Sequence, residues 1–310
     1  MKKLDNVIAL IGPTASGKSD LAIELALALN TEVISADSRL VYRDFNIGTA
    51  KPTIDELAKV KHHCVDIVSP IDDFSVSNYM DFAKLGMNDL FSNDKVPVVA
   101  GGTGFYVKSL LGELDIPKVE PNPEFRKKMQ AIIDEKGKEY LHGILREKDF
   151  ISAEKLHYND CFRVIRALEV IEALGIPMSE AQKKKNNNFN VIYIFLDALD
   201  RAFLYDRINR RVDIMLELGL VEEVKNLIEK YGKTISLLKT LGYKEVSEYL
   251  DGSYSFEEMK ELIKKNTRNF AKRQLTWFRA VENTHKFYID ELDKEELLLR
   301  VKDKCLSMML

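Results

Sequence analysis

The stretch IALIGPTASGKSDLAIELALALN, residues 8–30, decides the fold of this 310-residue chain. It begins with an apolar run, passes through Gly-Pro-Thr-Ala-Ser-Gly-Lys-Ser and continues as a segment rich in Ala and Leu. The apolar run predicts a buried strand over residues 6–11, and the Ala/Leu segment predicts a helix over residues 18–29. The turn between them has the phosphate-loop spacing, in the strand-to-helix position that this pattern requires.

This loop has the composition of a diphosphate-binding site. Its glycines let consecutive backbone N–H groups point inward, and the helix N-terminus adds the positive end of its dipole. Lys18 supplies a positive charge to the phosphates, and Ser19 can ligate Mg²⁺. The pattern does not identify the reaction, because the group beyond the diphosphate is either a phosphoryl group or a group that leaves its phosphates behind. The expected diphosphate-binding residues are Gly12, Pro13, Thr14, Ala15, Ser16, Gly17, Lys18 and Ser19.

A parallel sheet is expected around this strand and helix. The β-branched run TEVISA, residues 31–36, predicts a second strand, and a strand, a helix and a strand at this spacing make a β-α-β unit. Further strands are predicted over residues 63–68, 96–100 and 191–199, and the remainder of the chain has a helical pattern. The predicted fold class is therefore α/β: a P-loop NTPase-like core with a parallel sheet flanked by helices.

An all-helical insertion is expected within this core. Residues 115–125 contain three prolines and predict a linker, and residues 183–190, KKKNNNFN, predict a second one. Between them, residues 124–181 have a helical pattern without a convincing strand. We therefore assign the core and the insertion to residues 1–116 with 189–310 and to residues 117–188, respectively.

Charge and cysteine content limit the function classes. The formal net charge of −3 gives no general attraction to nucleic acid or to an anionic membrane, so such binding requires a local basic patch. The three cysteines form no CxxC pair, which disfavours a disulfide framework or a zinc site. His62-His63-Cys64 is expected to be structural, because adjacent residues of a strand point to opposite faces. With no membrane-length apolar stretch and no targeting segment, we expect a cytoplasmic protein. We also expect it to be a monomer.

Two polar side chains are predicted at the carboxyl edge of the sheet, where open α/β sheets bind ligands. Asp37 follows the second strand and is either a ligand-facing carboxylate or an ordinary cap or loop aspartate. Thr103, in Gly-Gly-Thr-Gly, is either a donor to a substrate oxygen or an incidental hydroxyl in a tight turn. A phosphoryl-transfer enzyme is expected to have an Asp at the end of another core strand, and VPVVAGGTG has none. This absence disfavours a nucleotide hydrolase.

Two segments concentrate positive charge. Arg163 and Arg166 lie near a predicted helix start, with Asp160 as its cap. Residues 264–281 contain six Lys or Arg and no acidic residue. The helix face that this second segment forms is either solvated surface or a site for a nucleic-acid backbone. Its members, at helical spacing, are Lys265, Arg268, Lys272 and Arg279.

In combination, these motifs resemble the tRNA dimethylallyltransferases, which attach an isoprenoid chain to an adenosine of tRNA. The matching stretches, in the family's order, are GPTASGKS, DSRLVYRDFNIGTAKP, GGTGFY, RALEV, LGYKE and AKRQLTWFR. They cover nearly the whole chain, and IGTAKP and KRQLTWFR are far more specific than the phosphate loop. We expect a bacterial-type enzyme, because the chain has no room for the zinc-finger extension of some eukaryotic relatives.

The resemblance implies a carbon-transfer reaction. Dimethylallyl diphosphate would place its diphosphate in the loop, with Mg²⁺ near Ser19, and N6 of the adenosine immediately 3′ of the anticodon would attack C1 and expel pyrophosphate. By resemblance, Asp37 is the general base and Thr103 and Arg211 lie near the departing pyrophosphate, with Arg207 a weaker candidate. The implied tRNA contacts are Asp37, Ser38, Arg39, Leu40, Thr103, Arg126, Phe162, Arg163, Arg166, Lys239, Gly242, Tyr243, Lys244, Arg268, Lys272, Arg273, Gln274, Trp277 and Arg279.

One position departs from the family pattern, and three other functions stay open. Many members carry Gln where this chain has Leu40, and Leu cannot make a bidentate contact to adenine. A P-loop small-molecule kinase explains residues 8–37 but gives no role to the basic helix or the insertion. A related adenylate isopentenyltransferase would act on free AMP or ADP, whereas the long basic face favours a larger polyanion. The non-catalytic alternative is a nucleotide-dependent RNA-binding module.

Overall fold

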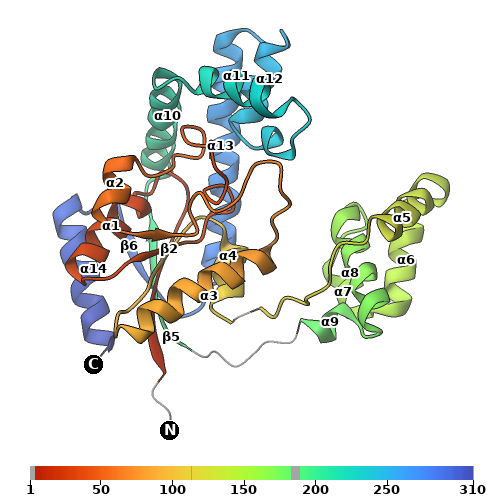
Figure 1. The fold of residues 1–310 in the computed structure, drawn as a ribbon, viewed down its shortest axis with the longest axis horizontal. Helices are drawn as coiled ribbons and strands as arrows, with labels where there is room; N and C mark the ends of the chain where they lie inside the picture. The colour runs from red at the N-terminus through yellow and green to blue at the C-terminus, as the bar shows by residue number, and fades with distance from the viewer. Residues whose placement is uncertain (1–3, 113, 183–188, 310) are drawn as a thin grey trace. The chain divides into compact units, whose positions relative to one another are not determined.

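Six strands form one parallel sheet in the computed structural model, which describes residues 4–112, 114–182 and 189–309 (Figure 1). The spatial order is β3-β2-β4-β1-β5-β6, and every neighbouring pair is parallel. This arrangement confirms the predicted α/β fold with a parallel sheet. The strand bounds are Asp5–Ile11 (β1), Val33–Ser35 (β2), His62–His63 (β3), Val98–Ala100 (β4), Phe189–Asp197 (β5) and Thr284–Tyr288 (β6).

The apolar run at the start of the sequence forms β1, which lies between β4 and β5. Ile8 pairs with Val98 on one side and with Ile192 on the other. Val7 and Ile11, like the residues between them, are completely buried. A central parallel strand is covered on both faces, so it is apolar throughout instead of alternating between apolar and polar residues.

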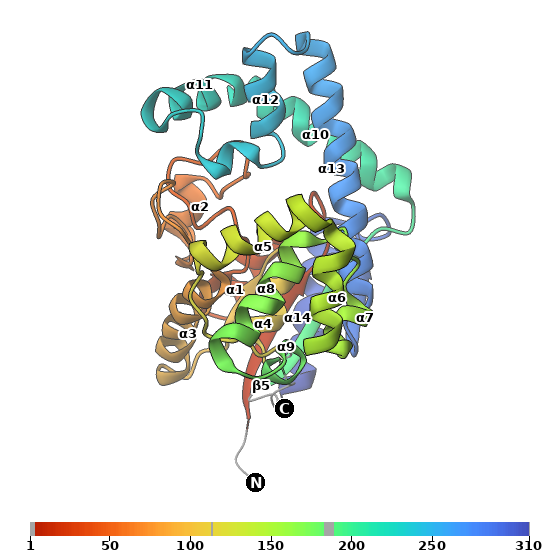
Figure 2. The same cartoon turned by 90° about the vertical axis from the view of Figure 1, so that its right-hand side faces the viewer.

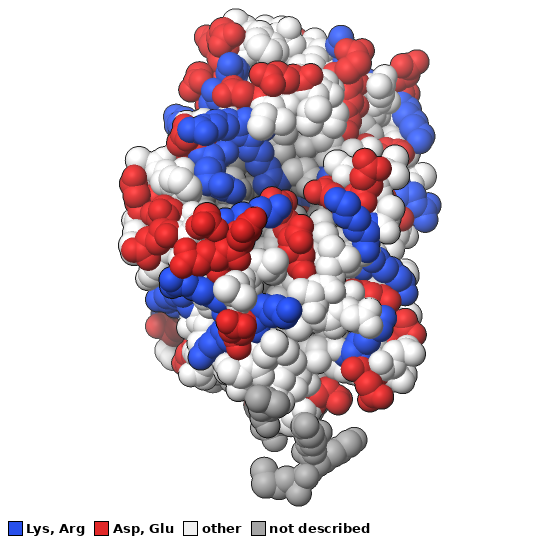
Figure 3. All heavy atoms as spheres, turned by 90° about the vertical axis from the view of Figure 1, so that its left-hand side faces the viewer, with Lys and Arg blue, Asp and Glu red and all other residues white. Residues whose placement is uncertain are grey.

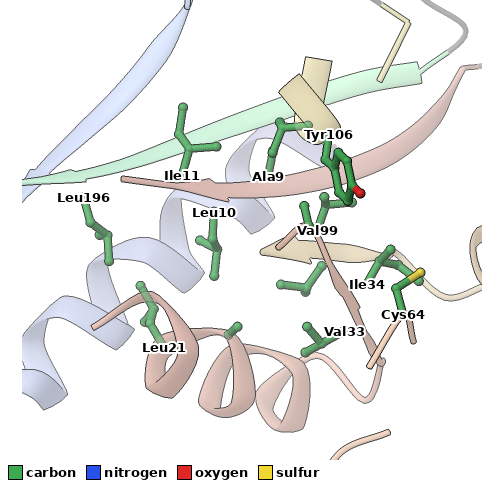
Figure 4. Packing of buried hydrophobic residues seen from close by; sticks show 14 of the residues in the cluster. Ala9, Leu10, Ile11, Leu21, Val33, Ile34, Cys64, Val99, Tyr106 and Leu196 are labelled. Carbon is green, nitrogen blue, oxygen red and sulfur yellow. The ribbon is translucent and has the colours of Figure 1, made fainter. Parts of the chain in front are cut away.

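Helices cover the sheet. In Figure 4, Leu10 points toward α1 (Lys18–Ala28), which carries Leu21, while its neighbour Ile11 points to the other side of the strand. Helix α1 packs against α14, and α4 packs against both α3 and α13. The further helices of this part of the chain are α2 (Ile54–Lys59), α3 (Val76–Ser92), α4 (Gly104–Leu110), α10 (Arg201–Glu217), α11 (Leu220–Tyr231), the 3₁₀ turn η1 (Ser236–Lys239), α12 (Tyr243–Leu250), α13 (Phe256–Arg279) and α14 (Lys294–Met309).

The chain divides into two compact units. The core unit, Met1–Leu111 with Asn188–Leu310, contains the sheet, and the helical unit is Gly112–Asn187. The helical unit has its own apolar cluster, built around Leu141, Leu145 and Leu168. Figure 2 shows its helices, which are α5 (Pro123–Lys136), α6 (Lys138–Lys148), α7 (Phe150–Lys155), α8 (Cys161–Leu174) and α9 (Met178–Ala181).

One local prediction is confirmed and two are wrong. Asp160 caps α8 as expected, since its carboxylate accepts a bond from the backbone N–H of Arg163 at 3.3 Å. The strand predicted over residues 63–68 is wrong, because β3 is only His62–His63 and the left-handed backbone of Cys64 (φ 62°) ends it. The remainder after residue 199 is not all helical, because Thr284–Tyr288 forms the edge strand β6.

Two other expectations concern the second linker and membrane-spanning helices. Most of the predicted second linker, residues 183–190, lies outside the described residues, and Phe189 already belongs to β5. Within residues 4–112, 114–182 and 189–309, no helix has both the length and the apolar character needed to cross a membrane.

Candidate active site

The phosphate loop connects the carboxyl end of β1 to the N-terminus of α1. Gly12 has φ +152°, and a Cβ there would lie 2.5 Å from the carbonyl oxygen of Leu196, so a larger residue requires β5 to move. Gly17 has φ +86° and directly precedes α1. No side chain among the described residues caps this helix, so its first N–H groups are available to a ligand in the loop.

Lys18 is partly buried, with its ammonium group inside the loop. The ammonium group donates to the carbonyl oxygen of Pro13 at 2.6 Å and to Oγ of Ser16 at 3.3 Å. Burial is the main cause that lowers the pKa of Lys18 to about 7; the positive charge of Arg211 acts in the same direction, and Asp37 opposes both. Lys18, Arg211 and Asp37 therefore belong to one electrostatic cluster.

Helix α10 supplies two arginines, one helical turn apart, to this cluster. Nε of Arg207 donates to the carbonyl oxygen of Ala15 at 2.8 Å, and so it holds the one non-glycine residue of the loop that has a left-handed backbone (φ 62°). Burial lowers the pKa of the Arg211 guanidinium, whereas Asp37 and Asp20 raise it. The structure thus places both arginines at the loop, and Arg207 makes the direct bond to it.

Asp37 and Thr103 follow the adjacent strands β2 and β4, and backbone contacts hold their loops together. Oδ1 of Asp37 accepts the N–H of Arg39 at 2.8 Å. Oγ1 of Thr103 accepts the N–H of Ser38 at 3.0 Å, and the N–H of Thr103 donates to the carbonyl oxygen of Ala36 at 3.2 Å. The two predicted catalytic side chains therefore lie on two loops that are bonded to each other.

Strand β5 ends at Asp197, so one core strand does carry an acid at its end, although β4 does not. This carboxylate is buried and accepts bonds from Arg201 at 2.6 and 3.1 Å and from the N–H of Ala198 at 2.8 Å. Burial raises its pKa, but the bonds from Arg201 and Ala198 outweigh this effect and the pKa is lowered. Asp197 thus has structural partners, with Arg279 a further cation at 3.5 Å.

The basic face of α13 lies partly along α10 and only partly in solvent. Nη1 of Arg268 donates to Oδ1 of Asn209 at 2.7 Å, and Nζ of Lys272 lies 5.8 Å from the ring centroid of Tyr205. Lys272 remains exposed, as does Arg273 on the neighbouring position. Residue spacing predicted that these charges share a face, but only the packing of α10 determines how much of that face is open.

Some predicted tRNA-binding residues are interior. Gln274 is 6% exposed and Tyr243 is completely buried. The Tyr243 hydroxyl donates to Oε1 of Glu223 at 2.7 Å. Glu223 also accepts the N–H of Ile47 at 2.8 Å, so it anchors the IGTAKP segment, although no sequence signal had marked it. Gly242 is buried as well, whereas the neighbouring members of the predicted set, Lys239 and Lys244, are exposed.

Trp277 and the remaining predicted residues of the core unit lie at or near the surface. A Cβ on Gly104 would lie 2.1 Å from the Trp277 ring, so the indole packs directly on the start of α4. Arg39 is exposed and Leu40 is half-buried.

In the helical unit, two predicted tRNA-binding arginines are held by one buried carboxylate. Glu169 accepts bonds from Arg126 at 2.8 and 2.9 Å, from Arg166 at 2.5 Å and from the N–H of Asn122 at 2.7 Å. Burial raises the pKa of Glu169, but these bonds, led by Arg126, outweigh it and lower the pKa to about 2. Arg126 and Arg166 therefore join α5, α8 and the segment before α5.

Phe162 and Arg163, at the start of α8, are the exposed members of the predicted set in this unit. The Phe162 residue is 73% exposed, and Nε of Arg163 lies 3.4 Å from Oδ2 of Asp160. Phe162 also lines a cleft of about 350 Å³, together with Arg126, Lys127, Gln130 and Ile165.

Both histidines of the His-His-Cys stretch have partners in the core unit. Nδ1 of His62 lies 2.8 Å from the carbonyl oxygen of Val60, and Nε2 of His63 lies 2.7 Å from the Glu32 carboxylate. Among the described residues, no three His, Cys, Asp or Glu side chains are grouped in a way that could hold a metal ion. On the face of the molecule shown in Figure 3, basic and acidic side chains are interspersed.

Known proteins are similar to this chain in sequence and in fold. The family model described as IPP transferase matches residues 40–281. A protein named tRNA dimethylallyltransferase from Acetivibrio thermocellus is 46% identical over 301 residues, which cover 96% of each chain. A protein with the same name from Alkaliphilus oremlandii is 45% identical over 301 residues, which cover 96% of this chain and 95% of the other.

Solved structures give the same result. The full-length tRNA isopentenylpyrophosphate transferase of Bacillus halodurans superposes with a TM-score of 0.73 at 36% identity, covering 99% of this chain and 98% of the other. A eukaryotic dimethylallyltransferase acting on tRNA gives a TM-score of 0.82 at 27% identity, covering 96% of this chain and 77% of the other. The chain therefore belongs to the IPP transferase family, the family of the tRNA dimethylallyltransferases.

Proposed function

We propose that this enzyme transfers a dimethylallyl group from dimethylallyl diphosphate to N6 of the adenosine immediately 3′ of the anticodon in tRNA, and releases pyrophosphate. The names of its relatives support the reaction class. The observation that carries the proposal is the grouping of one carboxylate, Asp37, with the cations Lys18 and Arg211 at the phosphate loop. A site that transfers an allyl carbon to an amine needs a base for the acceptor and positive charge for the leaving group.

Asp37 acts as the general base. The lone pair of the N6 amine is delocalised into the adenine ring, so the amine attacks C1 well only if its proton is removed as the bond forms. The N6–C1 bond forms, the C1–O bond breaks with its electron pair leaving on pyrophosphate, and the N6 proton passes to Asp37. The bond from the N–H of Arg39 to Oδ1 orients the carboxylate and leaves Oδ2 to accept this proton. General-base assistance contributes about 10²–10⁴-fold.

The leaving pyrophosphate is stabilised by cations and one hydroxyl. Lys18, now bonded to Pro13 and Ser16, turns to the phosphate oxygens, and Arg211 adds a second positive charge. The Thr103 hydroxyl accepts the N–H of Ser38 and donates to Oγ of Ser38 at 3.4 Å, so its hydrogen has to leave this long bond to donate to the departing oxygen. Donors aimed at developing charge lower the barrier most when they are fixed in advance.

The residues present fit a Mg²⁺ ion at the rim of the loop. Ser19 is exposed in the first turn of α1, where its hydroxyl can act as one oxygen ligand. Mg²⁺ in such loops takes few protein ligands and several substrate and water oxygens, so a cluster of acidic side chains is not required. When bound, the ion neutralises charge on the diphosphate.

The exposed members of the predicted set are proposed to contact tRNA. In the core unit these are Arg39, Lys239, Lys244, Lys272, Arg273 and Arg279, and in the helical unit they are Phe162 and Arg163. Their charges would contact the phosphate backbone, while Phe162 offers an aromatic surface to an unstacked base.

The test is pyrophosphate release together with mass spectrometry of the RNA nucleosides. We expect release only with dimethylallyl diphosphate, Mg²⁺ and an anticodon stem-loop that has adenosine 3′ of the anticodon. A matched stem-loop with guanosine there is expected to be inert. Turnover of free AMP or ADP in place of the stem-loop would identify an adenylate isopentenyltransferase, and ATP turnover that ignores the allylic diphosphate would identify a kinase.

A further inference from the structure

We propose that Gln274 is a positioning residue that ties the phosphate loop to the turn carrying Thr103, and that it does not contact RNA. The proposal rests on the proposed function, because it concerns the geometry of the same site. Gln274 lies in the α13 segment that resemblance assigns to tRNA. Its own side chain belongs to the interior face of that helix, with Ala271, Leu275 and Phe278, which are also buried.

The amide of Gln274 makes one hydrogen bond through its oxygen and one through its nitrogen. Its Oε1 accepts the backbone N–H of Thr14 in the phosphate loop at 2.8 Å, and its Nε2 donates to the carbonyl oxygen of Gly102 at 3.0 Å. One partner is only a donor and the other only an acceptor, so a single orientation of the amide satisfies both. Gln274 is 6% exposed, which leaves its amide little access to an RNA base.

Through these two bonds Gln274 joins the segments that carry the reaction. A Cβ on Gly102 would lie 2.5 Å from Nε2 of Gln274, so only glycine allows the amide to approach this closely. Gly102 directly precedes Thr103, which is bonded to Ser38 beside Asp37. One side chain therefore sets the spacing between the diphosphate site and the residues proposed to act on the base and on the leaving oxygen.

This arrangement predicts a kinetic signature. Without the amide, the N–H of Thr14 and the carbonyl of Gly102 lose their buried partners, and the two loops are free to shift. A shift of about 1 Å in a reacting group can cost about 100-fold in rate. An RNA contact would instead appear in the affinity for RNA, with turnover at saturating RNA preserved.

The experiment compares Gln274→Met with Thr276→Ala in the full-length enzyme. Thr276 is exposed on the same helix and its hydroxyl donates to the carbonyl oxygen of Lys272, one turn earlier, so it is the matched control. For Gln274→Met we expect a kcat about 10- to 100-fold lower, weaker binding of inorganic pyrophosphate by calorimetry, and a stem-loop Kd within about twofold of the parent. Weakened RNA binding with unchanged kcat would overturn the proposal, as would no change in any of these parameters.

Gln274→Glu supplies a second measurement, the pH dependence of activity, which would not change if Gln274 had only a general packing role. A protonated Glu can accept from Thr14 and donate to Gly102, whereas an ionised Glu repels the Gly102 carbonyl and the diphosphate. The activity of Gln274→Glu relative to the parent enzyme should therefore rise as the pH falls from about 8 to about 6, because burial raises the pKa of such a carboxyl. A flat ratio contradicts the two-bond arrangement.

Failure of the proposed function is distinguishable from failure of this inference. If the parent enzyme does not transfer a dimethylallyl group, the reaction assignment fails. Binding of inorganic pyrophosphate to the parent, Gln274→Met and Thr276→Ala proteins still tests whether Gln274 positions the loop. Circular dichroism of all three proteins shows whether each is folded.

Discussion

The cations at the phosphate loop and the arginines bound to Glu169 in the helical unit are held in opposite ways. In the core, burial lowers the pKa values of Lys18 and Arg211, and the one carboxylate that opposes this shift in both cases, Asp37, is the proposed base. In the helical unit, hydrogen bonding to Glu169 raises the pKa of Arg126. The first pair is under-neutralised and suits an incoming anion, whereas Arg126 already has its anion in the fold.

This difference distinguishes arginines available to a ligand from arginines with a structural role, which the sequence alone does not do. Arg126, Arg166 and Arg211 are all arginines on helices, and resemblance assigned all three to substrates. In the structure, however, Arg126 and Arg166 donate to the buried carboxylate of Glu169.

The largest effect is expected for Lys18→Met. Removing one preorganised cation from a leaving-group site costs about 10²–10³-fold in turnover. The variant should be close to the parent in stability, because burial disfavours the charged form of Lys18 and lowers its pKa to about 7. Steady-state kinetics and urea unfolding measure the two quantities. Turnover within a few-fold of the parent enzyme would show that the loop does not hold the leaving group.

Glu169→Gln should affect stability and not chemistry. Gln cannot satisfy Arg126, Arg166 and the N–H of Asn122 together, and we expect a loss of about 1–3 kcal/mol in urea unfolding. The pKa of Glu169 is lowered from 4.5 to about 2, so its contribution is complete above pH 4.5 and is lost as the pH falls toward 2. Glu154→Gln, which breaks an exposed pair with Arg146, is the control, with an expected cost below about 0.5 kcal/mol. Equal losses in both variants would contradict the structural role.

The pH dependence of pyrophosphate binding should reveal Lys18. The pKa of Lys18 in the free enzyme is lowered to about 7, and the bound anion favours the charged form. Binding is therefore strongest below about pH 7 and weakens as Lys18 loses its proton, by about tenfold between about pH 6 and about pH 8. Calorimetry on the parent and on Lys18→Met separates this effect from the titration of pyrophosphate itself. Parallel curves for the two proteins would exclude Lys18 as the titrating group.

The smallest effect is expected for Lys272→Gln. Loss of one phosphate contact should weaken stem-loop binding a few-fold and reduce the slope of log K against log salt by about 1. Lys225→Gln, on the exposed surface of α11 and outside the proposed contact set, makes the same charge change and should leave the slope unchanged. Identical slopes for the two variants would assign the exposed face of α13 to ordinary solvated surface.

The sequence was sufficient to predict local structure where the hydrophobic pattern and the residue types indicate the same element. The strand, loop and helix around Gly12 to Ser19 follow from hydrophobic pattern and glycine spacing, and the Asp160 cap follows from residue type. The edge strand β6 was missed because none of its five residues, THKFY, is fully buried, so no continuous apolar run marks it. The strand expected over residues 63–68 ends before Cys64, which has a left-handed backbone. A cysteine gives no sequence signal for that conformation.

Tertiary partners could not be inferred in the same way. From its place at a strand end, Asp197 resembles a Mg²⁺ ligand, but in the structure it forms an ion pair with Arg201. Gln274 looks like part of a basic surface until the buried face of α13 is known. Arg207 and Arg211 differ by one helical turn, and only the packing of α10 shows that Arg207 bonds directly to the loop.

The glycines of the turn after β4 set limits on how this enzyme can be redesigned. A side chain at Gly101 would meet the Ala36 backbone at 2.1 Å, which no substitution of another residue can relieve. A side chain at Gly104 would meet the Trp277 ring at 2.1 Å, which a smaller residue at 277 can relieve. In a mutational library, position 101 should therefore tolerate only glycine in every background, whereas position 104 should accept alanine only in combination with a change at 277.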